Sequence, residues 1–166
     1  MPSEDPIAEQ GKSDQPLAID KITGEAPVGI RGWLLFFACS MAIRPIFALL
    51  GILGVAFLLP AAPADRVVLI GYIGLSLPMV AYCSYAAFRL WRKDGAAVHV
   101  TTRYLVAYLA YSAVLAVVSF AVPVTHPQVS VLMGDLRFQG LGGVFYSLLW
   151  TKYLKESVRV ANTYQR

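Results

Sequence analysis

Charge is scarce in this chain, and acidic charge is missing where intramembrane chemistry would need it. Charged residues make up 14% of the 166-residue sequence, compared with about 25% in soluble proteins. No Asp or Glu lies inside any of the long apolar runs. Paired carboxylates, which serve acid–base catalysis and metal binding, are therefore excluded from those runs.

Cysteine and histidine are also few, with two of each. Cys39 and Cys83 lie within apolar runs, so we interpret them as small buried side chains and not as a disulfide or metal pair. His99 and His126 fall in or near connections on opposite sides of the expected topology. The sequence contains no HExxH, GxSxG or glycine-rich phosphate loop. We predict no catalytic residues, no metal and no cofactor, and a protein that is not an enzyme.

Long apolar runs are what the chain has in abundance, and 57% of its residues are hydrophobic. A helix needs about 20 apolar residues to cross the hydrocarbon layer. The sequence predicts an all-α fold, an integral membrane bundle of four transmembrane helices. The predicted spans cover about residues 33–59, 67–91, 104–124 and 138–154.

The fourth span is the shortest of the four. Only 14 residues lie between the charged Arg137 and Lys152, and as a helix they would extend about 21 Å. Both charged side chains would have to extend toward opposite membrane surfaces. The alternative is a helix that starts earlier, near Ser130, and is buried between the other three.

Residues 1–28 differ from the rest, because they are polar, acidic and interrupted by proline. Their composition is typical of a disordered tail, here a cytoplasmic one. No basic end directly precedes a short apolar core, so we expect the first span to be retained as an anchor and not cleaved. Residues 29–166 form the predicted membrane domain.

Basic residues are distributed unevenly about the predicted spans. The Lys and Arg assigned to one side are Lys21, Arg31, Arg89, Arg92, Lys93, Arg103, Lys152, Lys155, Arg159 and Arg166. Only Arg66 and Arg137 fall on the other side. An excess of Lys and Arg marks the cytoplasmic side. Both termini are therefore predicted to be cytoplasmic, and the positive net charge is explained without nucleic-acid binding.

Arg44 is the most unusual residue within a span. A helix that begins near Trp33 places Arg44 about 16 Å deep. A charge there costs at least about 2.5–3.5 kcal/mol, so it should face protein or water. The following Pro45 lacks an N–H, and we expect it to interrupt the first helix. Two interpretations stay open: Arg44 lines a polar cavity, or it is a structural residue of a shorter, shallower span.

Hydroxyl and small residues recur inside the spans. Tyr and Ser side chains are expected to hold the helices together by interhelical hydrogen bonds of roughly 0.6 kcal/mol each. The glycine pairs Gly51/Gly54 and Gly71/Gly74 would permit close approach of neighbouring backbones.

The C-terminal segment carries the most specific pattern. Trp150, Tyr153 and Ser157 repeat at helical spacing with Val160 and Tyr164, so one helical face is predicted to continue through Asn162. Lys155 and Arg159 lie on a neighbouring face that suits anionic headgroups. The candidate headgroup or partner contacts are Trp150, Tyr153, Lys155, Ser157 and Arg159.

A family resemblance rests on the two ends of the membrane domain. The early Gly32–Trp33–Leu34–Leu35 and the late Trp–x–x–Tyr–x–x–x–Ser–x–Arg–Val–x–Asn–Thr–aromatic pattern resemble the bacterial membrane family called domain of unknown function 2569. The resemblance covers about residues 29–164. It implies four membrane helices in a bacterial inner membrane, and it supplies no activity or ligand.

Two functions remain open from the sequence. The preferred one is a non-catalytic interaction, assembly or accessory component in the lipid bilayer, with a membrane-protein partner or a second copy of itself. The alternative is a minimal oligomeric transporter or channel in which Arg44 lines a polar path. Recognition of anionic lipid by the basic C-terminal residues is a third hypothesis.

Overall fold

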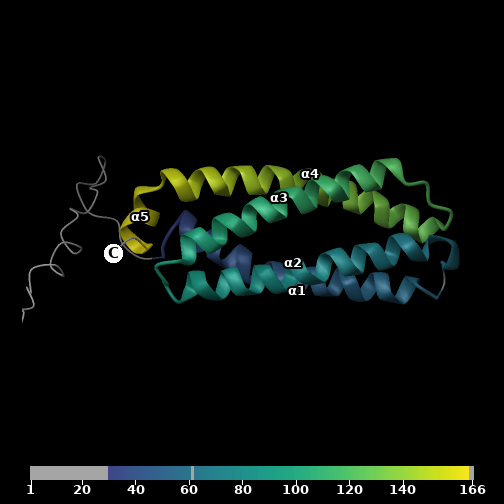
Figure 1. The fold of residues 1–166 in the computed structure, drawn as a ribbon, viewed down its shortest axis with the longest axis horizontal. Helices are drawn as coiled ribbons and strands as arrows, with labels where there is room; N and C mark the ends of the chain where they lie inside the picture. Colours follow the sequence, from purple (N-terminus) through teal and green to yellow (C-terminus); the bar gives the residue numbers. More distant parts are fainter. Residues whose placement is uncertain (1–29, 61, 165–166) are drawn as a thin grey trace, which may run out of the picture.

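The fold consists of long helices that lie side by side (Figure 1). The structure, a computed structural model, describes residues 30–60 and 62–164, without the side chains of residues 158 and 159. Its helices are α1 (Trp33–Leu58), η2 (Pro63–Asp65), α2 (Arg66–Trp91), α3 (Ala97–Ala121), α4 (Pro127–Glu156) and α5 (Val158–Tyr164). No strand occurs in these ranges, which confirms the all-α prediction. The predicted tail of residues 1–28 lies outside them.

Three helices are long and apolar enough to cross a membrane, not four. They cover Trp33–Leu58, Pro63–Trp91 and Ala97–Ala121. The fourth predicted span, at about 138–154, is less apolar, because α4 carries Gln139, several glycines and Lys152 within that range, and its crossing of a membrane stays a prediction. α4 also begins at Pro127, eleven residues earlier than predicted and close to the alternative start near Ser130. It is not enclosed by the other helices, since Phe138 and Phe145 are exposed.

Helix α1 runs without a break through Pro45, so the predicted interruption is wrong. Proline at position 45 removes the N–H that the Met41 carbonyl would accept in an α-helix. That carbonyl instead accepts a hydrogen bond from the Cys83 Sγ of α2, at 3.5 Å. Cys83, predicted to be only a small buried side chain, therefore replaces the missing bond and ties α2 to α1.

Two other carbonyls, each four residues before a proline, also accept a hydrogen bond from a side chain. The Leu59 carbonyl precedes Pro63 by four residues and accepts from the Arg66 Nε at 3.1 Å. The Ser119 carbonyl precedes Pro123 by four residues. It accepts from the Arg137 Nε at 3.0 Å and Nη2 at 2.9 Å. Arg137 thus donates to a carbonyl near the end of α3. In apolar surroundings a carbonyl without a donor is destabilising.

Helices α3 and α4 approach each other closely at two glycines of α4. A Cβ at Gly140 would lie 2.9 Å from the Ala116 Cβ and from the Ser112 carbonyl oxygen of α3. A Cβ at Gly143 would collide with the Ser112 side chain. The glycine pairs singled out in the sequence do not have this role. Gly54, Gly71 and Gly74 have nothing within 4 Å of an added Cβ, and at Gly51 the nearest atom is 3.5 Å away.

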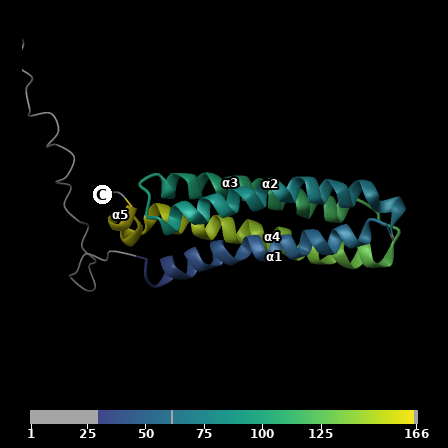
Figure 2. The ribbon, with the colours of Figure 1, turned by 90° about the horizontal axis from the view of Figure 1, so that it is seen from below.

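The C-terminal helix does not continue α4. Ser157 adopts an extended backbone (φ −78°, ψ 116°), and α5 then turns across the end of the bundle (Figure 2). The chain is therefore helical through Asn162, as predicted, but a break at Ser157 interrupts the single helical face expected from Trp150 to Tyr164. Val160 and Tyr164 are buried there, and the Tyr164 hydroxyl donates to the Leu90 carbonyl at 2.8 Å. This bond helps to complete the end of α2.

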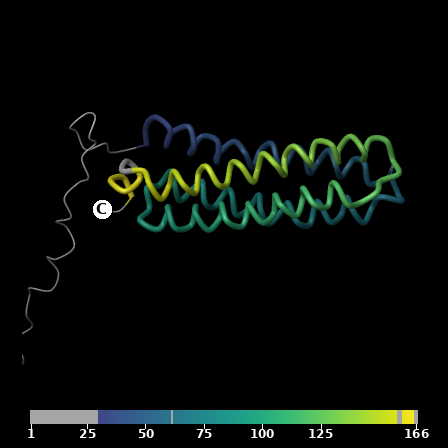
Figure 3. Tube along the Cα trace, turned by 90° about the horizontal axis from the view of Figure 1, so that it is seen from above, coloured from purple at the N-terminus to yellow at the C-terminus, as the bar shows by residue number. Residues whose placement is uncertain are grey.

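The described chain begins and ends at the same end of the bundle. The start of α1, the α2–α3 connection and α5 gather there, whereas the other two connections lie at the opposite end (Figure 3). At that opposite end the Asp65 carboxylate accepts hydrogen bonds from the Thr125 N–H and hydroxyl and from the His126 N–H. One carboxylate thus joins the α1–α2 connection to the start of α4.

Two apolar cores fill the bundle, one toward each end. The core near α5, here the proximal core, contains Leu34, Phe37, Leu90, Leu105 and Trp150 among others. The other, the distal core, contains Val55, Leu69, Leu115, Met133 and Leu136. Between them, at mid-length, the side chains leave a cavity.

Candidate functional site

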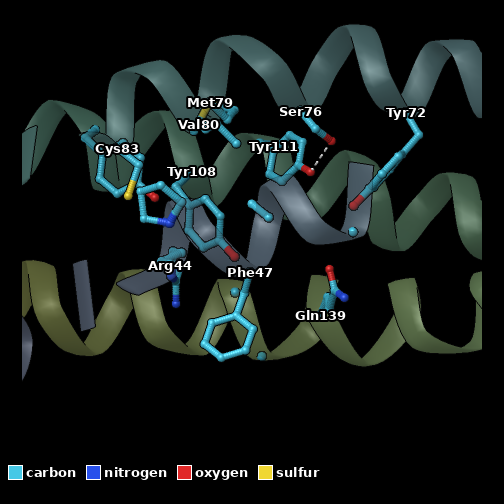
Figure 4. A pocket seen from close by; sticks show the side chains of 16 residues that line it. Arg44, Phe47, Tyr72, Ser76, Met79, Val80, Cys83, Tyr108, Tyr111 and Gln139 are labelled. Atoms are coloured by element: carbon cyan, nitrogen blue, oxygen red, sulfur yellow. Dashed lines mark hydrogen bonds between the residues drawn. The ribbon is translucent and has the colours of Figure 1, made fainter. Parts of the chain in front are cut away.

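The cavity between the two cores has a volume of about 340 Å³ and is lined by all four long helices. Arg44 to Gly51 of α1 form one wall, and Tyr72 to Cys83 of α2 form another. Three tyrosines of α3 and the Gln139–Gly143 turn of α4 complete it. In the close-up, Arg44 and Tyr72 lie toward opposite ends of the cavity (Figure 4).

Arg44 reaches the cavity from the middle of α1. It lies about 16 Å along the helix from Trp33 and about 21 Å from Leu58. Its guanidinium carbon is 3.8 Å from the ring centre of Tyr146 and 4.5 Å from that of Tyr108. The sequence left two interpretations of Arg44 open. This position fits the one in which Arg44 lines a polar cavity.

The two rings stabilise the charge of Arg44 but leave it short of hydrogen bonds. A desolvated cation over an aromatic face gains about 2 kcal/mol, comparable with the cost of placing the charge at this depth. The Nη1 atom of Arg44 is buried and has no hydrogen-bond partner among the described residues. No carboxylate belongs to the cavity lining as described. A buried charged donor without an acceptor is destabilising, and a bound acceptor would remove that cost.

Hydroxyl groups form most of the remaining polar lining. Tyr104, Tyr108 and Tyr111 are spaced four and three residues apart, so they share one face of α3. The Tyr111 and Ser76 hydroxyls are hydrogen-bonded to each other at 2.8 Å (Figure 4). Tyr146, beneath Arg44, is likewise hydrogen-bonded to the Ser40 hydroxyl at 2.8 Å. These two bonds join α2 to α3 and α1 to α4, which confirms the predicted interhelical role of hydroxyls.

The sequence predicts these tyrosines as interhelical hydrogen-bonding residues and does not place them around Arg44. Their spacing on α3 was a usable signal for one polar face. What the sequence could not give is the rotation of α4, which brings Tyr146 against Arg44.

The cavity is open on the side where α1 faces α4. Phe47 of α1 and Gln139 of α4 both line it and are both exposed. Arg44 and Phe47 also line a second hollow, a groove of about 430 Å³ that runs along α1. The central cavity and this groove therefore share Arg44 and Phe47 in their linings.

The chemistry of the lining favours binding over catalysis. One fixed positive charge, several hydroxyls and an amide can hold an oxyanion by charge-assisted hydrogen bonds. Among the described residues no carboxylate or imidazole lines the cavity, so no general base is placed to activate a Ser or Tyr hydroxyl. The cavity walls between these polar groups are apolar, with Pro45, Met79 and Val80.

The predicted C-terminal contact residues are not gathered at one surface. Trp150 is 4% exposed and its ring stacks on Phe37 at 4.5 Å, so it belongs to the proximal core. Tyr153 and Ser157 are half-buried, and Lys155 is exposed at the end of α4. The side chain of Arg159 lies outside the described part of the chain. Their contact with headgroups stays a prediction.

Comparison of the chain with protein-family models, with curated proteins and with solved structures gave no match in any of the three. The resemblance to domain of unknown function 2569 stays a prediction.

Proposed function

We propose that this chain is a non-catalytic membrane component that binds an oxyanion inside its helix bundle, with Arg44 as the principal contact. The observation that carries this proposal is the Nη1 of Arg44, which is buried and has no acceptor among the described residues, on a side chain that lines a cavity with several hydroxyls. A purely structural arginine would be expected to bond a carbonyl, as Arg137 does at the end of α3. Arg44 therefore differs from Arg137 in having donors left for a ligand.

The membrane setting is part of the proposal. Exposed apolar side chains cover the outer faces of all four long helices, and on α4 they include Phe138, Leu141 and Phe145. At about 45 Å, α4 is long enough to cross with the other three, and its small residues Gly140 and Gly143 are turned inward. We infer four crossings, with both termini on the cytoplasmic side of a bacterial inner membrane, because the basic residues concentrate at the end where α1 begins.

The geometry supports binding more than conduction through one bundle. The proximal and distal cores separate the cavity from the two ends of the bundle. A solute crossing one chain would have to open an apolar core. A pathway between copies, and an accessory role toward another membrane protein, stay predictions.

The test is retention of a ligand after purification. Native mass spectrometry of protein extracted in a mild neutral detergent should show an acidic small molecule bound to the natural protein. Arg44→Gln should lose it, Arg44→Lys should keep part of it, and Arg31→Gln, changed at an exposed arginine at the start of the described chain, should keep all of it. An identical bound mass in the natural protein and in Arg44→Gln would contradict the proposal.

A further inference from the structure

The groove beside the cavity is apolar over most of its length. It is lined by Phe36, Cys39, Ser40, Ile43, Arg44 and Phe47, which all belong to α1. These residues recur every three or four positions and therefore lie on one face of the helix. Phe36, Ile43 and Phe47 are exposed along it. Arg44 is the only charged residue in this lining.

Access to Arg44 is lateral. The two apolar cores stand between the cavity and the ends of the bundle. The open side, flanked by Phe47 and Gln139, lies at mid-length between α1 and α4. Apart from Gln139, exposed side chains on the adjoining parts of α1 and α4 are apolar and include Ile46, Leu50 and Phe138, as on a lipid-facing surface. A ligand that reaches Arg44 without opening a core has to come from the hydrocarbon layer.

We propose that the ligand is an amphiphile with a single apolar chain and an oxyanion head, a carboxylate or a phosphate monoester, that enters from the bilayer between α1 and α4. This inference rests on the proposed function and names its ligand class. The head lies against Arg44 Nη1, with the hydroxyls of the cavity around it. The chain lies in the groove along α1, against Phe36, Ile43 and Phe47.

Charge complementarity and the two hollows that share Arg44 and Phe47 support this occupant over others. A neutral lipid would leave Arg44 unpaired, whereas an oxyanion accepts from it. A small hydrated anion would have no reason to enter from hydrocarbon and would leave the groove empty. An amphiphile fills the apolar groove and the polar cavity together, and the groove gains apolar contact for each chain methylene buried.

The experiment measures the thermal unfolding midpoint of the full chain in nanodiscs of phosphatidylcholine, followed by tryptophan fluorescence. The probes are dodecanoate, dodecyl phosphate, dodecanol, acetate and inorganic phosphate at matched concentrations. Dodecanoate or dodecyl phosphate should raise the midpoint in a saturable way. Dodecanol, which has the same chain without charge, and the two short anions should not.

Two variants separate the head from the chain. Arg44→Gln should weaken the apparent affinity for the acidic amphiphiles about 10- to 100-fold, the equivalent of one charged hydrogen bond. Phe47→Ala should weaken it severalfold, whereas Phe57→Ala, at an exposed phenylalanine of α1 outside the groove, should leave it unchanged. If Arg44→Gln does not fold, the Phe47→Ala and Phe57→Ala pair and Arg44→Lys decide the question.

Each outcome has one meaning. If only one of the two dodecyl anions stabilises the protein, that head is the natural chemistry and the inference holds. If acetate or inorganic phosphate acts as strongly as the dodecyl anions, the oxyanion site stands and the amphiphile inference fails. If no anion has an effect that depends on Arg44, both the inference and the proposed function fail.

Discussion

At the scale of single residues, the structure is governed by carbonyls and charges that need partners in apolar surroundings. Three carbonyls, each four residues before a proline, accept a hydrogen bond from a side chain, and the donors are Cys83, Arg66 and Arg137. Arg44 is the reverse case, a buried donor with no acceptor among the described residues. This difference between the arginines supports the proposed role of Arg44 in binding.

A double-mutant cycle tests the bond between Cys83 and the carbonyl freed by Pro45. Cys83→Ala should lower the free energy of unfolding by about 1 kcal/mol more in the natural chain than in a Pro45→Ala background. In that background, the N–H of residue 45 can bond the Met41 carbonyl, so the thiol is no longer needed. The free energies would be measured by denaturant titration in mixed micelles. Equal effects of Cys83→Ala in both backgrounds would show that the thiol does not perform this role.

At the scale of the helices, α4 is held against α3 by the absence of side chains at two positions. Gly140 and Gly143 let the backbones meet, and the apolar face of α4 stays outside. α5 is held differently, because its Val160 and Tyr164 are buried as part of the proximal core.

Gly140→Ala should lower the free energy of unfolding by about 1–3 kcal/mol, because the added methyl group meets the Ser112 carbonyl and the Ala116 side chain. Gly134→Ala, on the same helix with open space around it, is the matched control. It should be neutral or stabilising by up to about 1 kcal/mol, through helix propensity. Equal destabilisation by both changes would contradict the close approach of α3 and α4.

Tyr164→Phe should weaken the docking of α5 by about 1 kcal/mol at neutral pH, because it removes the bond to the Leu90 carbonyl. Burial raises the pKa of Tyr164 to about 12 from its ordinary value of 10.0. The folded state therefore favours the protonated hydroxyl, whose contribution is complete below pH 10 and is lost as pH rises toward 12.

Limited proteolysis at the C-terminus, as a function of pH, measures this docking. In the natural chain, cleavage should increase between pH 10 and 12. Tyr164→Phe should be cleaved more readily at neutral pH and should lack that step. The same pH profile in both proteins would assign the alkaline transition to other groups.

At the scale of the whole molecule, the open point is whether α4 crosses the membrane. Three helices qualify by composition alone, and α4 does not. A C-terminal alkaline phosphatase fusion after residue 166 should be inactive and a green fluorescent protein fusion at the same place should fluoresce, because four crossings return the chain to the cytoplasm. A phosphatase fusion within residues 122–126 should be active. An active phosphatase at the C-terminus, together with a cytoplasmic N-terminus, would mean three crossings.

Hydropathy and length were enough to predict the helices, but not their contacts. α1 and α2 begin and end within one residue of the predicted spans 33–59 and 67–91. α4 was predicted too short, because Arg137 looked like a membrane boundary and is in fact bonded to the end of α3. The break at Ser157 was hidden by a helical spacing that continues through Tyr164.

The candidate site could be found only in part. Arg44 was identifiable because a charge at mid-span is costly wherever it points. Tyr108 and Tyr146 could not be assigned to it, since their contact with Arg44 depends on how α3 and α4 are rotated about their axes. The lateral groove also follows from packing and has no local signature in the sequence.

The most direct test of the central claim is a solid-state NMR measurement of the dipolar coupling between arginine guanidinium ¹⁵N and ligand ³¹P. Arginine-labelled protein in phosphatidylcholine bilayers would be mixed with dodecyl phosphate or inorganic phosphate, with ³¹P signals of lipid and ligand resolved. An oxyanion at Arg44 predicts a coupling typical of a direct hydrogen bond that is present in the natural protein and in Arg31→Gln and absent in Arg44→Gln. A coupling that persists unchanged in Arg44→Gln would contradict the account, as would the absence of a coupling in the natural protein both to either phosphate and to dodecanoate labelled with ¹³C at its carboxylate.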